Sequence, residues 1–186
     1  MTVPRLAIAL CHYPVLDPRN QVSCSAITNL DVHDMARSAT TYGVDAAYVV
    51  TPVAKQRELV EAILQHWLGG TGGDRCPDRS TAFKILHPAG SIEEVLALEA
   101  VAADGQTPTV VVTSARHDPA IVEVATLRER LQRESALILF GTARGLAPSV
   151  LERADLRLAP LEGTGSYNHL SVRAAIAIYL DRLRGR

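Results

Sequence analysis

Short, continuously apolar runs alternate along this chain with segments of helical periodicity. Strands are predicted at the apolar runs 5–10, 46–51, 83–86, 109–113, 136–140 and 156–160. Apolar residues follow one another in these runs instead of alternating with polar ones, which is typical of strands that are buried on both faces. Strands that alternate with helices indicate an α/β fold, with a mostly parallel sheet flanked by helices.

Helix start signals support the assignment of the segments between the strands. Apolar residues recur every three or four positions across 56–68, which predicts an amphipathic helix. Ser91 lies three residues before Glu94, the spacing of a capping box. Asp118 and Pro119 match the N-cap and the first helical residue of a further helix.

The last helix is apolar on more than one face. Its main stripe consists of Val172, Ile176, Tyr179, Leu180 and Leu183. Several alanines and an isoleucine extend the apolar surface around the helix. A helix that is apolar nearly all round is buried on two sides, so this one predicts a contact with a second subunit.

Composition indicates one domain with an aliphatic core. A chain of 186 residues fits a single domain, which we place at 1–186. Hydrophobic residues make up 47% of the chain and aromatic residues only 4%. The net charge of -1 is not that of a dedicated nucleic-acid-binding protein, so any contact with nucleic acid must be local. The glycine-rich segment 68–81 is predicted to be an exposed, mobile loop.

Cysteine spacing and hydropathy disfavour several other classes. The three cysteines lie far apart and match neither a disulfide framework nor a zinc motif, so no metal is expected. No apolar run reaches the length of a membrane span, and the run near the first residue is too short for a signal peptide. We therefore expect a soluble, cytoplasmic protein without membrane contacts.

Candidate binding residues follow the strands, because ligands of open parallel sheets bind beyond the carboxyl ends of the strands. The segment "CHYPVLDPRN" after the first strand lacks the glycine fingerprint of a dinucleotide site. Small residues and glycines instead follow the last three strands, at 113–115, 140–145 and 161–171. Such loops allow a ligand to approach the backbone and predict a small neutral or zwitterionic ligand.

A second polar group lies on the helix predicted after residue 28. Asn29, His33 and Arg37 are spaced four residues apart and share one helix face. Thr28 or Asn29 is expected to cap this helix, and Gly43 to end it. The face is either a solvated surface or a site, where an arginine is suited to hold a phosphate or to stabilise developing negative charge.

Three segments, in this order, resemble the motifs of the SPOUT class of RNA methyltransferases. The stretch "TNLDVHDMARSATTYGV" is similar to the first motif, "LILFGTARGLAPSVLERADLRLAPL" to the second and "YNHLSVRAAIAIYLDRL" to the third. The resemblance extends across essentially the whole chain, and is especially close to a small bacterial branch of S-adenosylmethionine-dependent RNA methyltransferases. It implies a C-terminal trefoil knot, at about 109–186, and methyl transfer to a nucleotide in tRNA or rRNA.

The resemblance also implies where S-adenosylmethionine is bound before it is released as S-adenosylhomocysteine. The corresponding residues are Thr113, Ser114, Ala115, Phe140, Gly141, Thr142, Gly145, Leu161, Gly165, Asn168, Leu170 and Ser171. Gly163 and Gly165 are expected to let the chain fold tightly against the ligand, and Asn168 to cap the last helix. Members of the class are similar in forming homodimers, through the knot and the last helix.

By the same motif match, Arg37 is the first candidate for a catalytic residue. The second candidates are His33, Asn29, Arg144 and His169. Contacts with the RNA substrate are expected from His12, Tyr13, Arg75 and Arg79. The second motif usually carries an acidic residue where this chain has Ala143 and Arg144. The alternative function is therefore a knotted module that binds the cofactor or RNA without catalysis.

Overall fold

Seven parallel strands form the central sheet of the computed structural model, which describes residues 3–116 and 121–186. Their spatial order is β5-β4-β1-β8-β6-β9-β7, and all the paired neighbours run parallel. The strands are β1 Leu6–Cys11, β4 Ala46–Val50, β5 Leu86–Ala89, β6 Thr109–Thr113, β7 Ile121–Val122, β8 Ala136–Gly141 and β9 Leu156–Leu158. The predicted α/β architecture with a parallel sheet is confirmed.

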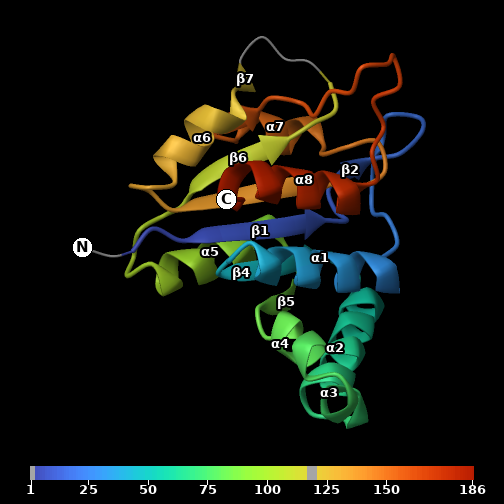
Figure 1. Cartoon of the computed structure of the whole chain (residues 1–186). Helices are drawn as coiled ribbons and strands as arrows, with labels where there is room; N and C mark the ends of the chain where they lie inside the picture. The colour runs from blue at the N-terminus through green and yellow to red at the C-terminus, as the bar shows by residue number, and fades with distance from the viewer. Residues whose placement is uncertain (1–2, 117–120) are drawn as a thin grey trace.

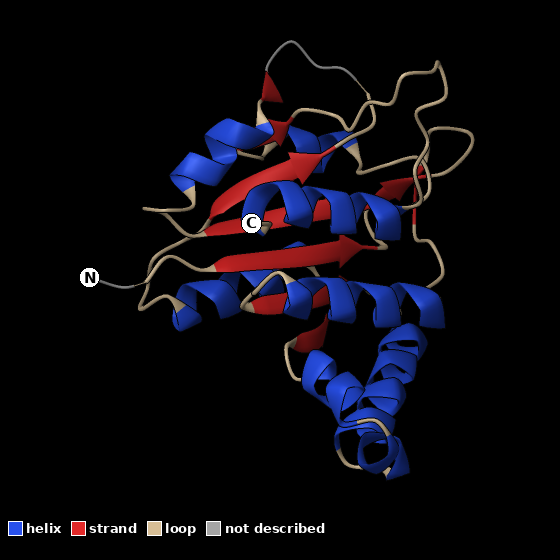
Figure 2. Ribbon diagram, in the orientation of Figure 1, coloured by secondary structure: helices blue, strands red, loops and turns tan. Residues whose placement is uncertain are grey.

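Helices cover both faces of this sheet (Figures 1 and 2). They are α1 Asn29–Thr41, α2 Ala54–Leu68, α3 Thr71–Arg75, α4 Pro77–Phe83, α5 Ile92–Ala102, α6 Val124–Arg130, α7 Pro148–Glu152 and α8 Val172–Arg184. α1 and α8 lie side by side across one face, and α5 and α7 pack on the other. None of these helices is long and apolar enough to cross a membrane.

The central strand β1 shows why the apolar runs form this sheet. Leu6 and Leu10 face the core beneath α1 and α8, whereas Ala7 and Ala9 face the core beneath α5 and α7. All four side chains are fully buried. Burial of each large aliphatic side chain contributes about 1.5–3 kcal/mol, and the small residues leave room for the helices on the second face.

Helix α1 begins and ends as the sequence predicts. Thr28 is its N-cap and forms a capping box with Asp31. Tyr42 is the C-cap, and Gly43 follows in the left-handed region with a φ of 64°. A short antiparallel hairpin, β2 Val15–Leu16 with β3 Val22–Ser23, connects β1 to this helix.

The prediction of a mobile loop at 68–81 is wrong, because helices α3 and α4 occupy most of this segment. Together with α2 they form a helical arm that projects from the sheet (Figure 1). Gly72 is buried, and a Cβ atom there would lie 2.5 Å from the ring of His66. The glycines therefore allow close packing within the arm. Glycine content alone does not distinguish such packing from a mobile loop.

Two element boundaries also differ from the predictions. The strand predicted at 83–86 begins only at Leu86, since Phe83 ends α4 and is buried in the core. Asp118 and Pro119 lie outside the described residues, but Ile121 and Val122 form β7 before α6 begins. Ile121 and Val122, which were predicted to be helical, thus form an edge strand that pairs with β9.

Candidate active site

Three loops meet at the carboxyl end of the sheet, after β6, β8 and β9. The side-chain nitrogen Nδ2 of Asn168 donates a hydrogen bond to the carbonyl oxygen of Ala115 over 3.2 Å. This bond joins the loop after β9 to the loop after β6, although 53 residues separate the two positions. The predicted convergence of these two loops is therefore present in the structure.

The loop after β9 presents an unpaired main chain. Among the residues that the structure describes, the N–H and C=O groups of 163–170 form no hydrogen bonds with one another or with other main-chain groups. Cβ atoms built on Gly163 and Gly165 would have no neighbour within 4 Å. The two glycines are thus not required for close packing within the chain, and their main-chain groups are accessible to a ligand.

The loop after β8 folds back tightly on itself. A Cβ atom at Gly141 would lie 2.6 Å from the backbone nitrogen of Leu146. Ala143 and Gly145 both adopt positive φ angles, 51° and 99°. The turn is held against the segment after β1, where the backbone nitrogen of Leu16 donates to the Gly145 carbonyl over 2.9 Å.

Thr142 in this loop is linked to His12 through a chain of side-chain hydrogen bonds. His12 Nδ1 lies 2.9 Å from Ser25 Oγ, and Ser25 Oγ lies 2.5 Å from Thr142 Oγ1. Thr142 Oγ1 donates to the Cys11 carbonyl oxygen over 3.2 Å. A hydroxyl has one proton to donate. Thr142 therefore accepts from Ser25, Ser25 accepts from His12, and Nδ1 carries the imidazole proton.

His12 is only 1% exposed, so the structure gives it an internal contact in place of the predicted contact with RNA. Burial lowers the pKa of its imidazole, while the Asp31 carboxylate and the Ala26 backbone act in the opposite direction. Within the described part of the chain, Nε2 has no hydrogen-bond partner. Tyr13 is partly exposed and lines a separate cavity of about 210 Å³ beside α5 and α7.

Helix α1 meets the start of α8 through a group of charges that the sequence did not single out. Arg173 Nη1 donates to Asp34 Oδ2 over 2.8 Å, and Arg173 Nε lies 3.4 Å from Asp31 Oδ1. Asp31 also completes the Thr28 capping box. The spacing of Asp31 and Asp34 on one helix face was the available signal, but their cationic partner lies 139 residues away from Asp34.

Arg37 lies on the exposed side of α1, two turns after Asn29. In the described ranges its guanidinium forms no hydrogen bond or ion pair. An exposed arginine without an internal partner is available to a phosphate or to a developing negative charge. The role of Arg37 in catalysis, which rests on the motif match, stays a prediction.

His33 points away from the three loops and into the helical arm. Its ring packs edge-on against Phe83 at 4.8 Å and against Trp67 at 5.5 Å between centroids. Burial lowers its pKa, and the nearby charges of Arg79 and Arg37 lower it further. His33 thus lies near Arg37, as the helix spacing predicts, but its ring contacts the aromatic side chains of the arm.

The helix cap at α8 differs from the prediction. Ser171 is the N-cap, and its hydroxyl accepts a hydrogen bond from the backbone nitrogen of Ala174 over 3.3 Å. Asn168 lies before the cap and uses its amide for the contact with Ala115. The assignment of Asn168 as the capping residue is therefore wrong, because a tertiary contact takes up its side chain.

The other predicted cofactor residues fall into buried and exposed groups. Phe140 and Leu161 are buried, and Phe140 packs near Tyr179, so a ligand can reach Phe140 only through its backbone. Thr113 Oγ1 donates to the Leu139 carbonyl, and Ser114 Oγ accepts from the Arg116 backbone nitrogen. Leu170 is 50% exposed.

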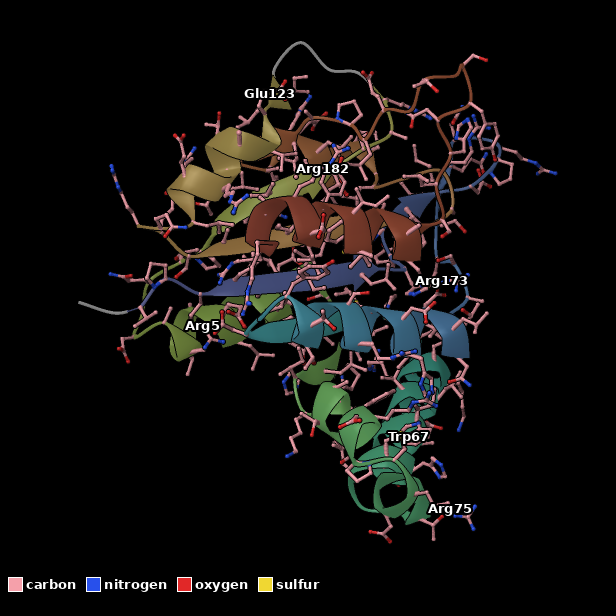
Figure 3. The ribbon with its side chains drawn as sticks, in the orientation of Figure 1. Arg5, Trp67, Arg75, Glu123, Arg173 and Arg182 are labelled. Atoms are coloured by element: carbon pink, nitrogen blue, oxygen red, sulfur yellow. The ribbon has the colours of Figure 1, made fainter. Side chains whose placement is uncertain are left out.

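The remaining candidates lie at the periphery of these loops. Arg144 is exposed and donates to the Pro18 carbonyl over 3.1 Å. His169 is exposed and packs edge-on against Tyr167. Arg75 and Arg79 lie on the helical arm, and Figure 3 shows Arg75 at the far end of the arm from Arg173. In the described residues, no cluster of histidine, cysteine or carboxylate side chains could hold a metal ion.

A protein-family model described as SAM-dependent RNA methyltransferase matches residues 5–185 of the chain. The chain belongs to this family. A tRNA (guanine-N(1)-)-methyltransferase of Oleidesulfovibrio alaskensis is 42% identical over 180 residues, which cover 97% of this chain and 42% of that protein. An uncharacterised protein of Aquifex aeolicus is 36% identical, over 96% of this chain and 88% of its own length.

Solved structures confirm the resemblance to the SPOUT class at the level of the fold. The SpoU methyltransferase AviRb from Streptomyces viridochromogenes, in complex with AdoMet, has a TM-score of 0.62 and 17% identity. The match covers 98% of this chain and 58% of AviRb. A TrmH/SpoU tRNA modifying enzyme of Aquifex aeolicus has a TM-score of 0.56 and 13% identity, over 98% of this chain and 76% of that one.

The family uses S-adenosylmethionine, and the three loops fit such a ligand. The main-chain groups of 163–170, which have no hydrogen-bond partner among the described residues, could pair with the hydrogen-bonding edge of an adenine and with the polar end of the methionine. Gly145 adopts a positive φ and a Cβ atom there would meet nothing within 4 Å, so the ligand can approach the backbone closely. These loops are thus compatible with a cofactor that is held mainly through backbone groups.

Proposed function

We propose that this chain transfers a methyl group from S-adenosylmethionine to a nucleotide of a tRNA, with the cofactor held among the loops after β6, β8 and β9. The observation that carries the proposal is the Asn168–Ala115 hydrogen bond, which brings together two of these loops, with an unpaired main chain beside it. The Oleidesulfovibrio relative is named for tRNA methylation, which favours tRNA over rRNA. The chain spans about two fifths of the length of that relative, so we propose the class of RNA and not the guanine N1 position.

When bound, the cofactor supplies a methyl group on a positively charged sulfur, which an acceptor atom of the nucleotide attacks in line. The residues of the chain then hold and orient the two partners, which is the main source of rate in such a transfer. We assign to Arg37 the contact with the substrate, because its exposed guanidinium has no partner in the described chain. It would stabilise a phosphate or the negative charge that develops as the acceptor loses its proton.

A homodimer and a knotted C-terminal segment complete the proposal. The side chains of Leu30, at the start of α1, and of Leu170, before α8, are 60% and 50% exposed. Exposed leucines beside the two adjacent helices favour a second copy packed there. The sheet order, in which β8 lies between β1 and β6 and β9 lies beyond β6, is compatible with a knot at about 109–186. Sedimentation or light scattering would test the dimer, which a monomer at working concentration contradicts.

Two measurements test the activity itself. Calorimetry with S-adenosylmethionine and S-adenosylhomocysteine should show saturable binding, and absence of binding by both would overturn the proposal. Mass spectrometry of nucleosides, from tRNA and rRNA of a deletion strain and of the same strain with the gene restored, should show one methylated nucleoside that returns in tRNA. A cofactor-binding module without catalysis would bind both ligands and leave the two nucleoside profiles identical.

A further inference from the structure

A groove lies between α1 and the helical arm, away from the three cofactor loops. It has a volume of about 340 Å³, and its lining residues are Asn29, His33, Ala62, Ile63, His66 and Trp67. The first two residues come from α1 and the others from α2. The proposed cofactor site uses none of the α2 residues, so their chemistry has no role in the function derived above.

The groove combines an apolar floor with polar side chains at its edges. Ala62, Ile63 and Trp67 supply the apolar surface. In the chain as described, the side chains of Asn29, His33 and His66 form no hydrogen bonds. An amide and two imidazoles offer both donors and acceptors. An occupant with a flat apolar face and a hydrogen-bonding edge would satisfy both parts of the groove.

Trp67 is held in place by rings and charge from three elements. Phe83 stacks against it at 6.0 Å with an interplanar angle of 28°. The rings of His33 and His66 meet it edge-on, and the Arg79 guanidinium lies 4.8 Å from its ring centroid. The indole is therefore fixed before any ligand arrives, which reduces the entropy that binding would cost.

The charges around the groove are of both signs. Arg79 lies over Trp67, and Arg37 is one turn beyond His33 on α1. Asp74 and Asp78 are exposed on the same arm. Binding there would thus depend on ring and amide contacts at the groove, with Arg79 beside it for a phosphate, and not on a uniform positive surface.

We propose that this groove binds an unpaired nucleobase of the RNA substrate, at a position separate from the nucleotide that is methylated. Recognition of RNA commonly uses bases that are splayed out, stacked on aromatic or arginine side chains and hydrogen-bonded along their edges. A purely apolar side chain of a protein partner would leave the amide and both imidazoles unsatisfied. The inference rests on the proposed function, because it names a second contact of the same RNA.

Trp67 is the single tryptophan of the chain, so its fluorescence reports on the groove directly. The full chain would be titrated with a tRNA mixture, a short single-stranded RNA and the same sequence as a duplex. The tRNA and the single strand should quench Trp67 in a saturable way, and the duplex should not. Unchanged fluorescence under conditions where fluorescence anisotropy shows bound tRNA would overturn the proposal.

Ala62→Gln provides the matched variant, since it fills the groove from an exposed helical position and removes no packed side chain. It should weaken tRNA binding roughly tenfold, as expected for one stacked base. The variant His66→Gln, which removes the imidazole but keeps a side chain of similar length against Gly72, should show a similar loss. Gln65→Ala, on the exposed surface of α2 outside the groove, is the control and should bind tRNA as the native protein does.

Measurement of cofactor binding shows whether this inference alone is wrong or the proposed function is wrong as well. The groove variants should bind S-adenosylhomocysteine with native affinity. Native tRNA affinity in both variants, with quenching unchanged, would overturn the groove assignment and leave methyl transfer intact. A native chain that binds S-adenosylhomocysteine but none of the RNAs would overturn both proposals, and specific capture of a protein segment in the groove would overturn the assignment to RNA.

Discussion

Arg173 Nη1 lies 2.8 Å from Asp34 Oδ2 and joins the first turn of α8 to α1. The loop before α8 carries the proposed cofactor contacts, and α1 carries Arg37. The ion pair is partly shielded from solvent, since the side chains of Arg173 and Asp34 are 31% and 42% exposed. It therefore links the loop with the proposed cofactor contacts to the helix that carries Arg37.

Replacement of Arg173 should loosen this connection. Arg173→Ala leaves Asp31, whose side chain is only 12% exposed, without its cationic neighbour, and is expected to reduce the free energy of unfolding by about 1–3 kcal/mol. It should also weaken binding of S-adenosylhomocysteine. Urea denaturation and calorimetry measure the two effects. Lys55→Ala breaks an exposed pair with Glu58 and should cost about 0.5 kcal/mol or less; equal losses in the two variants would contradict a special role for Arg173.

Gly141 and Gly163 provide a matched pair of glycine substitutions in two cofactor loops. Gly141→Ala places a Cβ atom 2.6 Å from the Leu146 nitrogen, so the turn must shift, at an expected cost of about 1–3 kcal/mol in stability and with weaker cofactor binding. Gly163→Ala meets no atom within 4 Å and should leave stability unchanged. Thermal unfolding and calorimetry compare the variants, and a destabilised Gly163→Ala would show that the open loop has a packing role.

Arg37→Ala should separate cofactor binding from methyl transfer. In the described part of the chain the guanidinium forms no hydrogen bond or ion pair, so the variant should unfold at the native temperature and bind S-adenosylhomocysteine normally. Methyl transfer to tRNA should fall by about 10²-fold or more, the usual loss when one group that stabilises transition-state charge is removed. A radiolabelled methyl-transfer assay measures this, and full activity would remove Arg37 from the mechanism.

Acid should destabilise the protein through histidines whose pKa is lowered in the folded state. The pKa of His12 is lowered by burial, so the unfolded chain, with an ordinary value near 6.5, binds more protons than the folded one in acid. The stability from a neutral His12 is complete above about pH 6.5 and decreases as the pH falls toward the folded pKa. Burial lowers the pKa of His33 and His87 as well, which acts in the same direction.

The substitution His12→Asn tests this assignment. The amide keeps a hydrogen-bonding group near the position of Nδ1 but does not titrate. The slope of unfolding free energy against pH should therefore become shallower by up to about 1.4 kcal/mol per pH unit below pH 6.5. Ser25→Ala breaks the chain to Thr142 but keeps the imidazole, and should lower stability by about 1–3 kcal/mol at neutral pH. Denaturation in urea at several pH values measures both, and an unchanged slope in His12→Asn would exclude His12 as a source of the acid sensitivity.

Local sequence patterns predicted the strands of the sheet, because a strand that is buried on both faces is recognisable from consecutive apolar residues. The run that became β8 is continuously apolar and is buried up to Phe140. Ser91 was predicted to cap α5 and does so. Spacing along one helix also placed Asn29 and Arg37 on a common surface, because helix geometry is the same in any fold. Burial pattern, caps and shared helix faces thus followed from the chain without its partners.

The tertiary structure decided between local arrangements that the sequence alone allowed, such as two possible caps for one helix. Both Asn168 and Ser171 are suited to a helix cap, and the contact with Ala115 left that position to Ser171. His12 follows β1 at the ligand end of the sheet, but contacts with Ser25 bury it.

Long-range packing likewise determined the helical arm, where Gly72 lies against His66, and the pairing of Arg173 with Asp34. The apolar pattern of the sequence thus specified the layers of this protein and the ends of several helices. Which polar groups meet, and whether a histidine lies inside or outside, depended on strand order, because that order brings together residues more than a hundred positions apart.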